Sequence, residues 1–418
     1  MDGSLLRPED DATARQAAGG AVALEHVRLG WRPIVARDRR VLGVRIEIKT
    51  IHDAVGTARA PALNAVICAL ADAMSVPRGI VVLAPLMSTL DSELNAAVEW
   101  SEKVNNSAGG IMLELGTEAL TSQQQPLIEA AQRKGLRFVL RQSSQSPPPD
   151  WQRLFAAVVA GADNAQTYDG EPALWVRDVH TRADVESALA RGAQATIGWP
   201  LDEPAVDPSA GLEPTRRAVL DIVRLIQSDA DVIALERAFK NEPSLSLLLL
   251  SVINSPAFAP GAAHAAPITS VRHAIMVLGY KRLVRWLVLL LGVSSANARS
   301  MPLIYMAVQR GFFLEALASH AAGMRDDLFA VGAFSLLQQI TGHSHERLFA
   351  SAALPRPVLD AVRAHEGVYG VYLALAEVVE RGNAAGSEKA AQLIGVSMGQ
   401  VNAALLSSIA SADAITMN

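Results

Sequence analysis

The hydrophobic pattern changes its period once along this 418-residue chain. From about residue 22 to 204, short apolar runs such as "RPIVA" and "GIVVLAP" alternate with amphipathic stretches such as "ELNAAVEWSEKV" and "DVESALARG". This alternation predicts an α/β domain with a largely parallel sheet, and the number of repeats favours a closed barrel. From Thr215 onward nearly every segment has the helical period, which predicts a second, all-α domain.

Composition sets the boundaries between these parts. Residues 199–214, "WPLDEPAVDPSAGLEP", are rich in Pro, Asp and Gly, which is typical of a connection. Residues 1–21 are polar, acidic and rich in small side chains, which is typical of a disordered tail. We therefore expect a tail at 1–21, a barrel at 22–204, a linker at 205–214 and a helical domain at 215–418.

Charge and hydropathy restrict the partners and the compartment. The longest apolar runs, Leu245 to Leu250 and Leu287 to Val293, fall far short of the roughly 20 residues that span a bilayer, and the N-terminus lacks a secretion signal. The net charge of −5 is too balanced to predict binding to nucleic acid or to an anionic membrane. The single cysteine, Cys68, excludes an internal disulfide, and its helical surroundings favour a buried thiol over a nucleophile. We expect a cytoplasmic protein.

Several stretches of the first half resemble the EAL domain in their order and spacing. "WRPIVARDRRVLGVRIEI" looks like the opening hairpin of that family, and "VVLAPLMSTL", "LELGTE", "RFVLRQSS", "VRDVHT" and "IGW" follow where later motifs fall. The EAL domain is a TIM-type barrel that in its active form hydrolyses cyclic di-GMP with two divalent metals. The resemblance implies a degenerate, shortened barrel, and the Pro-rich stretch 141–151 leaves its strand count open.

The resemblance also places the family's metal-binding positions, most of which carry other residue types here. They fall at Arg45, Ala84, Arg141, Gln142, Arg177 and His180, and one carboxylate remains at Glu114. Two-metal hydrolysis needs several anionic oxygens to hold both ions. We therefore expect no metal, no other cofactor and no enzymatic activity, with a residual phosphodiesterase as a third hypothesis.

Three of these positions suggest a different ligand site. Arg45, Arg141 and Arg177 would lie at the C-terminal mouth of the barrel, where function resides in this fold. Their guanidinium groups around Glu114 could hold a phosphate-bearing nucleotide without metal. In the alternative interpretation, the arginines point outward or pair with Glu114 and Asp178.

The second half resembles the HDOD domain, a helical signalling module related to the HD hydrolases. Residues 231–290 keep its E-P-x-L step, an apolar helix ending in N-S-x-x-F, and I-x-S-V-x-x-A-I-x-x-L-G. The run 245–253 is predicted to be a central buried helix that "NSP" ends. The next helix is predicted to begin at Thr269 or Ser270 and to end at Gly279.

True HD enzymes hold metals with a His-Asp step and further histidines. In this chain that step would fall at Ser335 and Leu336, which cannot hold a metal as an HD pair does. "HSHER" offers His343 and His345 on a predicted loop, which is a weak metal signal. We interpret His365 as a packed or capping residue.

The helix "YKRLVRWLVLLLGV" is the candidate partner surface. It begins with Lys281, Arg282 and Arg285, and this basic start is expected to face solvent beside Trp286. Exposed arginine next to an aromatic ring is enriched at interaction hot spots, whereas a merely solvated helix end would carry the same charges without a partner.

The whole chain thus resembles the bacterial EAL-HDOD two-domain signalling proteins. Our first hypothesis is a non-enzymatic cytoplasmic adaptor in signal transduction, whose HDOD module binds other signalling proteins. The alternative is a metal-independent sensor of cyclic di-GMP or of another nucleotide. Residues 390–409 look like a helix-turn-helix but lack basic residues in the would-be recognition helix, so we expect no nucleic-acid partner and interpret them as closing helices of the HDOD domain.

Overall fold

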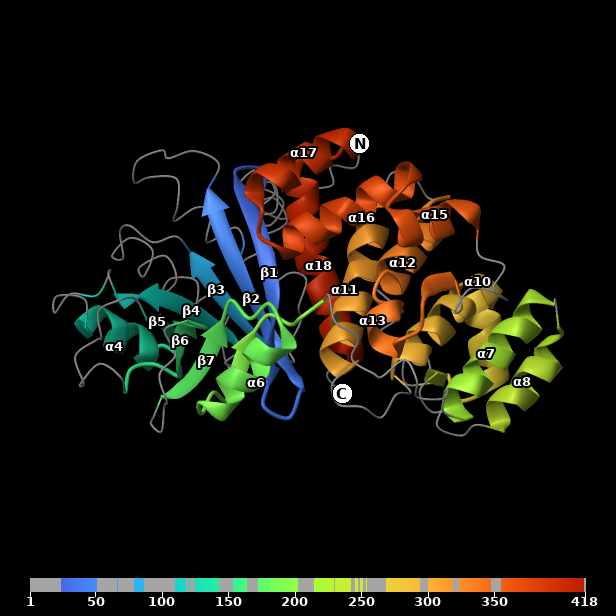
Figure 1. Ribbon diagram of the computed structural model, residues 1–418, viewed down its shortest axis with the longest axis horizontal. Helices are drawn as coiled ribbons and strands as arrows, with labels where there is room; N and C mark the ends of the chain where they lie inside the picture. Colours follow the sequence, from blue (N-terminus) through green and yellow to red (C-terminus); the bar gives the residue numbers. More distant parts are fainter. Residues whose placement is uncertain are drawn as a thin grey trace, which may run out of the picture.

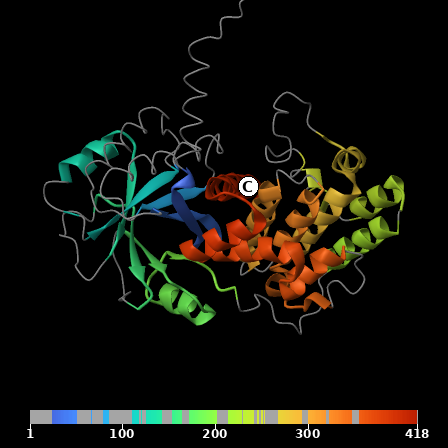
Figure 2. The ribbon, with the colours of Figure 1, turned by 90° about the horizontal axis from the view of Figure 1, so that it is seen from above.

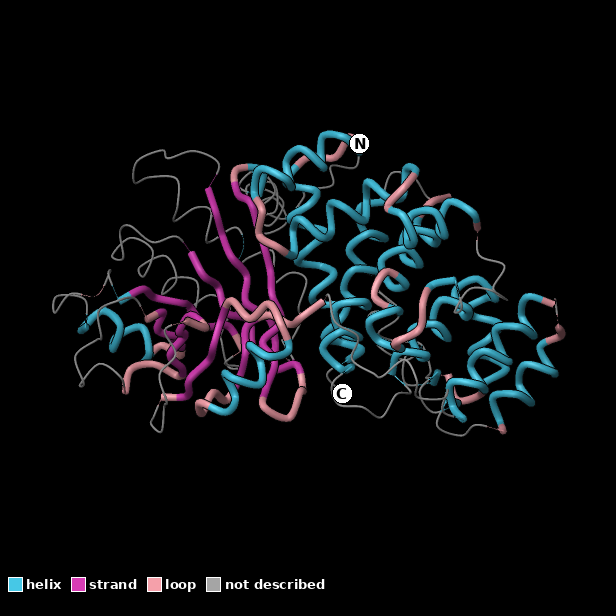
Figure 3. Tube along the Cα trace, in the orientation of Figure 1, coloured by secondary structure: helices cyan, strands magenta, loops and turns pink. Residues whose placement is uncertain are grey.

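The computed structural model has a strand-rich half followed by a helical half (Figures 1 and 3). It describes residues 24–50, 66, 79–85, 110–117, 120, 125–142, 153–163, 172–201, 214–228, 230–241, 245–246, 249–250, 253, 268–293, 300–318, 323–346 and 355–416. The predicted tail at 1–21, nearly all of the predicted linker, Cys68 and the "NSP" step at 254–256 lie outside these residues.

The strand-rich half is a closed barrel of eight strands in sequence order. β1 runs antiparallel to β2 and β8, and the other neighbouring pairs are parallel. The predicted TIM-type barrel with an opening hairpin is therefore confirmed, and the open strand count is eight. The strands are β1 (Val27–Ala36), β2 (Val41–Thr50), β3 (Ile80–Pro85), β4 (Ile111–Gly116), β5 (Arg137–Arg141), β6 (Ala157–Gly161), β7 (Ala173–Arg177) and β8 (Ala195–Ile197).

The strands separate an apolar core inside the barrel from apolar cores on its outer surface, because successive side chains of a strand point to opposite faces. Inside the barrel, Ile34, Val82, Met112, Val139 and Trp175 belong to one cluster of buried side chains. Outside it, helix α6 (Arg182–Ala190) packs on β6 and β7, and helix α4 (Gln125–Arg133) contributes to the large core that continues into the helical half.

The described residues from 214 onward contain helices and no strand, which confirms the predicted all-α half. Helix α11 lies at its centre and is buried along most of its length, because α12, α16 and α18 pack around it. The helices are α7 (Pro214–Gln227), α8 (Val232–Lys240), α10 (Val271–Val293), α11 (Met301–Leu317), α12 (Arg325–Phe334), α13 (Leu337–Thr341), α15 (Arg356–Ala364), α16 (Gly367–Glu380), α17 (Ala384–Ile394) and α18 (Met398–Thr416).

Two local predictions for this half are confirmed. Leu245, Leu249 and Ile253 are helical and buried at a spacing of four residues, as expected for a buried helix, while the central position belongs to α11. Ser270 Oγ accepts a hydrogen bond from the backbone N of residue 273 at 3.2 Å, so it caps the start of α10. Gly279, with φ of 72°, interrupts α10 at the predicted end.

No single helix in the described parts of the chain is long and apolar enough to cross a membrane. One pair, Ala384–Ile394 with Met398–Asp413, passes the same test of length and composition together but is bent by 104°.

The two halves share one apolar core along β1. In Figure 2 the red C-terminal helices lie beside the blue first strands of the barrel. Leu29 and Trp31 of β1 are buried, and the ring of Trp31 meets that of Tyr305 of α11 edge to face, with centroids 6.1 Å apart. Because this face of the barrel is covered by helices rather than water, the halves form one continuous structure.

Polar contacts fix the same boundary. Asn402 of α18 is fully buried, and its amide nitrogen donates to the carbonyls of Leu24 at 2.8 Å and Val27 at 2.9 Å. Its side-chain oxygen accepts from the backbone N of Leu29 at 3.3 Å. One side chain of the helical half thereby satisfies three backbone groups at the start of β1.

Candidate functional site

The barrel mouth contains a buried ion pair between β2 and β4. Nε and Nη2 of Arg45 donate to the two carboxylate oxygens of Glu114 at 2.6 and 2.8 Å. The side chains of Arg45 and Glu114 are 8% and 1% exposed. A bidentate pair at this depth fixes the geometry of both groups. For Arg45 the structure shows the alternative in which the arginine pairs with Glu114.

The charges continue outward along β2. Nη1 of Arg45 donates to Glu47 at 3.2 Å, and the second oxygen of Glu47 lies 3.4 Å from Nζ of Lys49. Burial alone would lower the pKa of Arg45, but Glu114 and Glu47 raise it. Burial alone would raise the pKa of Glu47, but Arg45 and Lys49 lower it. Arg45 and Glu47 are therefore charged at neutral pH.

The other two predicted arginines stand on the rim, separated by β6. Arg141 is the last residue of β5 and Arg177 the last of β7. Nη1 of Arg177 pairs with the exposed Asp178 at 2.5 Å, and its buried Nε has no hydrogen-bond partner among the described residues. The structure therefore joins Arg45 to Glu114 and leaves Arg177 half-exposed on another strand.

The described residues do not fit the two-metal centre that the family resemblance implies. Both oxygens of Glu114 accept from Arg45, so a guanidinium lies where metal ions would need anionic oxygens. Ala84, near the end of β3, and Gln142, directly after β5, add no carboxylate. Within the described ranges, no group of three or more His, Cys, Asp or Glu side chains could hold a metal ion.

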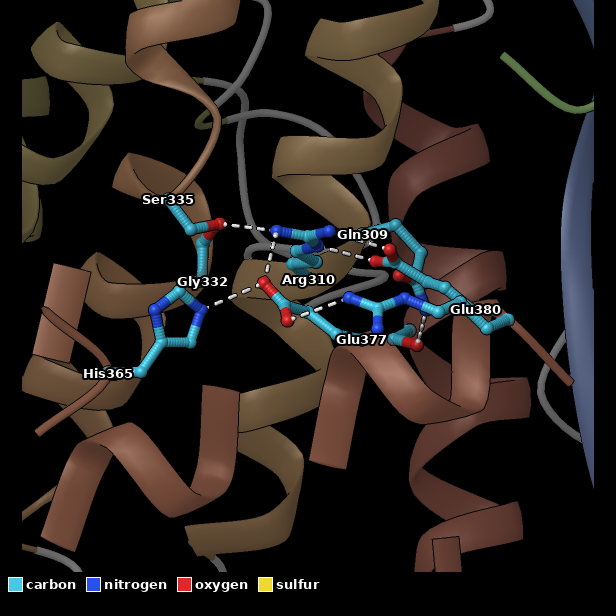
Figure 4. A network of polar contacts seen from close by, with 9 residues as sticks. Gln309, Arg310, Gly332, Ser335, His365, Glu377 and Glu380 are labelled. Carbon is cyan, nitrogen blue, oxygen red and sulfur yellow. Dashed lines mark hydrogen bonds and ion pairs between the residues drawn. The ribbon is translucent and has the colours of Figure 1, made fainter. Parts of the chain in front are cut away.

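A second charged group lies inside the helical half (Figure 4). Arg310 of α11 is 3% exposed, and its Nε and Nη2 donate to the carboxylate of Glu380 of α16 at 2.5 and 2.7 Å. Its Nη1 donates to Ser335 Oγ at 2.9 Å and lies 3.9 Å from Glu377. Burial alone would lower the pKa of Arg310, but Glu380 and Glu377 raise it. Two carboxylates and a hydroxyl thus hold a buried cation.

Ser335, the first of the two residues where HD enzymes have their His-Asp pair, belongs to this network. Ser335 accepts from Arg310 and donates to the carbonyl of Gly332 at 2.7 Å, whereas Leu336 is buried in the apolar core. Sequence reasoning missed Arg310. The available signal was a charged residue in the middle of the apolar helix "MPLIYMAVQRGFFLEAL", because such a residue is rarely buried without a partner.

The three histidines singled out in the sequence lie at helix ends, where one ends a helix and two are buried. His365 ends α15 in the left-handed conformation, with φ of 57°, and its Nε2 lies 3.0 Å from Glu377, so the capping interpretation is confirmed. His343 and His345 are buried near the end of α13. Burial lowers the pKa of His345, which favours a neutral ring at neutral pH.

The candidate partner surface on α10 needs a correction. Arg282 is exposed, as expected. Trp286 is only 4% exposed and packs in the core, so the prediction of an exposed arginine beside an accessible aromatic ring is wrong. Trp286 follows the buried Leu283 by three residues and therefore lies on the same face of the helix. The side chains of Lys281 and Arg285 lie outside the described residues, and a partner role for the basic positions stays a prediction.

The chain combines a closed eight-stranded barrel, whose first strand is antiparallel to both neighbours, with a helical half. Over residues 212–366 the chain matches the HDOD domain. The chain therefore has the predicted order of an eight-stranded barrel followed by a segment that matches the HDOD domain.

Known proteins are similar to parts of this chain. The cyclic di-GMP phosphodiesterase CdgJ of Vibrio cholerae serotype O1 is 24% identical over 231 residues, which cover 54% of this chain and 52% of that protein. The chain thus spans about half the length of this relative. Similar solved structures include the EAL domain of Mycobacterium smegmatis DcpA, which is 13% identical in sequence and has a TM-score of 0.33. That match covers 41% of this chain and 90% of the DcpA chain. The PaMucR phosphodiesterase in complex with c-di-GMP is 11% identical with a TM-score of 0.34, and the match covers 43% of this chain and 96% of that chain.

The similarity to CdgJ contradicts the expectation that the chain is not an enzyme, because that relative is a cyclic di-GMP phosphodiesterase. The expectation rested on replaced residue types at single positions. Residues 86–109 and 143–152, which come after β3 and β5, lie outside the described residues. The replaced positions alone therefore do not define the chemistry of the mouth.

Proposed function

We propose that this chain acts in cyclic di-GMP signalling, with the barrel mouth as the binding site for a phosphate-bearing nucleotide and the HDOD domain as the part that binds other signalling proteins. The observation that carries the proposal is the cationic rim of the barrel. Lys49 and Arg177 stand on it with side chains that are each 37% exposed, and Arg45 lies below them.

The chemistry of these groups suits a phosphate diester. Guanidinium and ammonium groups donate charge-assisted hydrogen bonds to phosphate oxygens, and Arg177 presents an Nε that has no partner among the described residues. Arg45 is held rigidly by Glu114, so it contributes a fixed positive charge rather than a mobile side chain. Binding of this kind requires no metal ion.

Calorimetry with cyclic di-GMP tests the proposal, with GMP as a competitor. Arg177→Met should weaken binding about 10- to 150-fold, the equivalent of one lost charge-assisted hydrogen bond. Arg224→Met is the matched control, because Arg224 forms a comparable exposed pair with Asp221 on α7. Absence of saturable heat with the wild-type chain, or equal weakening by both variants, would rule out this site.

A second candidate function is cyclic di-GMP hydrolysis, which the similarity to CdgJ favours. Incubation with cyclic di-GMP and Mg²⁺ or Mn²⁺ should then release the linear dinucleotide. Glu114→Gln should stop the release, whereas Glu186→Gln, which removes an exposed carboxylate on α6, should not. If the wild-type chain forms no linear product with either metal, this candidate is eliminated.

A further inference from the structure

The turn between α16 and α17 lies against the outward end of β2. Nζ of Lys49 donates to the carbonyl oxygen of Gly382 at 2.8 Å. Gly382 has φ of 65°, and a Cβ at this position would lie 2.9 Å from the Glu47 carboxylate. On the neighbouring strand, a Cβ at Gly30 would lie 2.6 Å from the Cα of Gly382. The helical half therefore approaches the barrel mouth so closely that side chains at these two positions would push it away.

A continuous series of charged contacts leads from the barrel interior to this turn. It runs from Glu114 to Arg45, then to Glu47, then to Lys49, and ends at the Gly382 carbonyl. The side chains are 1%, 8%, 38% and 37% exposed in that order. The inner members are fixed by burial, and the outer members are open to a ligand.

The other side of the turn is anchored in the helical half. Glu377 and Glu380, in the last turn of α16, hold the buried Arg310. The backbone N–H groups of residues 381, 382 and 383 donate to the carbonyls of residues 377, 379 and 378 at 3.0 to 3.1 Å. A displacement of Gly382 would therefore act directly on the end of α16.

We propose that the barrel mouth and the α16–α17 turn form one composite ligand site, in which a phosphate-bearing ligand competes with Glu47 and with the Gly382 carbonyl for Lys49. A phosphate oxygen is a stronger acceptor for an ammonium group than a neutral carbonyl, and its charge repels the Glu47 carboxylate. Binding at the mouth thus weakens the hold of the barrel on the turn. This inference rests on the proposed nucleotide binding and assigns Lys49 as the residue through which the helical half responds to it.

Hydrogen exchange of the full-length protein tests the inference at the amides of residues 381 to 383. Without ligand, Lys49→Met should speed their exchange by about tenfold, because it removes the hydrogen bond from Nζ to the Gly382 carbonyl. Lys240→Met is the matched control, since Lys240 pairs with Glu236 on α8, away from the barrel. Saturating cyclic di-GMP should speed exchange of the turn in the wild-type protein and have little further effect in Lys49→Met.

The outcomes separate this inference from the proposed function. If Lys49→Met leaves the turn as protected as in wild type, the coupling is overturned whether or not nucleotide binds. If calorimetry shows binding but the ligand leaves exchange of the turn unchanged, the composite site is overturned and the proposed function stands. If no nucleotide binds, the proposed function fails together with the ligand step, and the ligand-free response to Lys49→Met still reports the coupling by itself.

Discussion

Removal of the Glu114 carboxylate should destabilise the protein, because it leaves a buried guanidinium without its bidentate partner. Breaking a buried pair from one side costs about 3 to 5 kcal/mol. In Glu114→Gln the amide oxygen can still accept one hydrogen bond, and Glu47 remains 3.2 Å from Arg45, so we expect a loss of about 2 to 3 kcal/mol. Replacing both partners, as in Arg45→Met with Glu114→Leu, should restore stability to within about 1 kcal/mol of wild type, because no buried charge is left unpaired.

Urea unfolding, followed by circular dichroism and by tryptophan fluorescence, measures these differences. Glu186→Gln is the control, because it removes a pair with Arg39 in which Glu186 is 51% exposed, and it should cost less than about 1 kcal/mol. The reasoning is refuted if Glu114→Gln is no more destabilising than Glu186→Gln. It is also refuted if the double variant is as unstable as the single one.

Three further changes test the buried polar groups of the helical half. Burial raises the pKa of Asp413 to about 6, although the hydroxyl of Tyr305 that donates to it lowers the pKa. Between these two pKa values the folded protein keeps a proton on Asp413 that the unfolded chain has released, so stability should fall as pH rises from 3.8 to about 6. Asp413→Asn should remove this fall and gain up to about 3 kcal/mol of stability at pH 8, measured by thermal unfolding. An unchanged pH profile of stability in the variant would contradict the assignment. Arg310→Met leaves the buried Glu380 carboxylate without its cation, while Glu377 keeps its contacts with Arg381 and His365, and should cost about 3 to 5 kcal/mol; a loss below about 1 kcal/mol would show that the network in Figure 4 contributes little. Asn402→Leu removes three hydrogen bonds to backbone groups, of which the Val27 carbonyl keeps another donor, Arg28, and should cost about 3 kcal/mol or more, with faster exchange of the Leu29 amide; equal protection in the variant would exclude this role.

The fold could be predicted from the sequence because the period of the apolar residues changes from strand-helix alternation to pure helix near residue 205. The covering of β1 could not be predicted. In "VRLGWRPIV" the apolar residues alternate with charged or small ones, as in any half-buried strand. The pattern identifies a buried face but does not say whether α18 of the other half or a helix of the barrel buries it.

The site was predicted in part. The family resemblance placed Arg45 and Glu114 at the mouth, and their direct pairing was one of two alternatives. The extension to Glu47 and Lys49 was missed, although charges at every second position of "RIEIK" lie on one face of a strand by period alone. Their contact with Gly382 depends on a turn more than 300 residues away, which no local pattern encodes.

The helices that bind the barrel to the helical half come largely after the residues that match the HDOD domain. That match ends at residue 366. The helices α16, α17 and α18, which all contact β1, follow it and together span residues 367–416. Among the described residues, the barrel meets the HDOD segment largely through this C-terminal group of helices, and α11 of the matched segment also contacts β1 and β2. Since α16 carries the carboxylates of the Arg310 network on one side and leads into the Lys49 contact on the other, a change at the barrel mouth would reach the HDOD domain through α16. A flexible linker could not transmit such a change, because it would not fix the position of one half against the other.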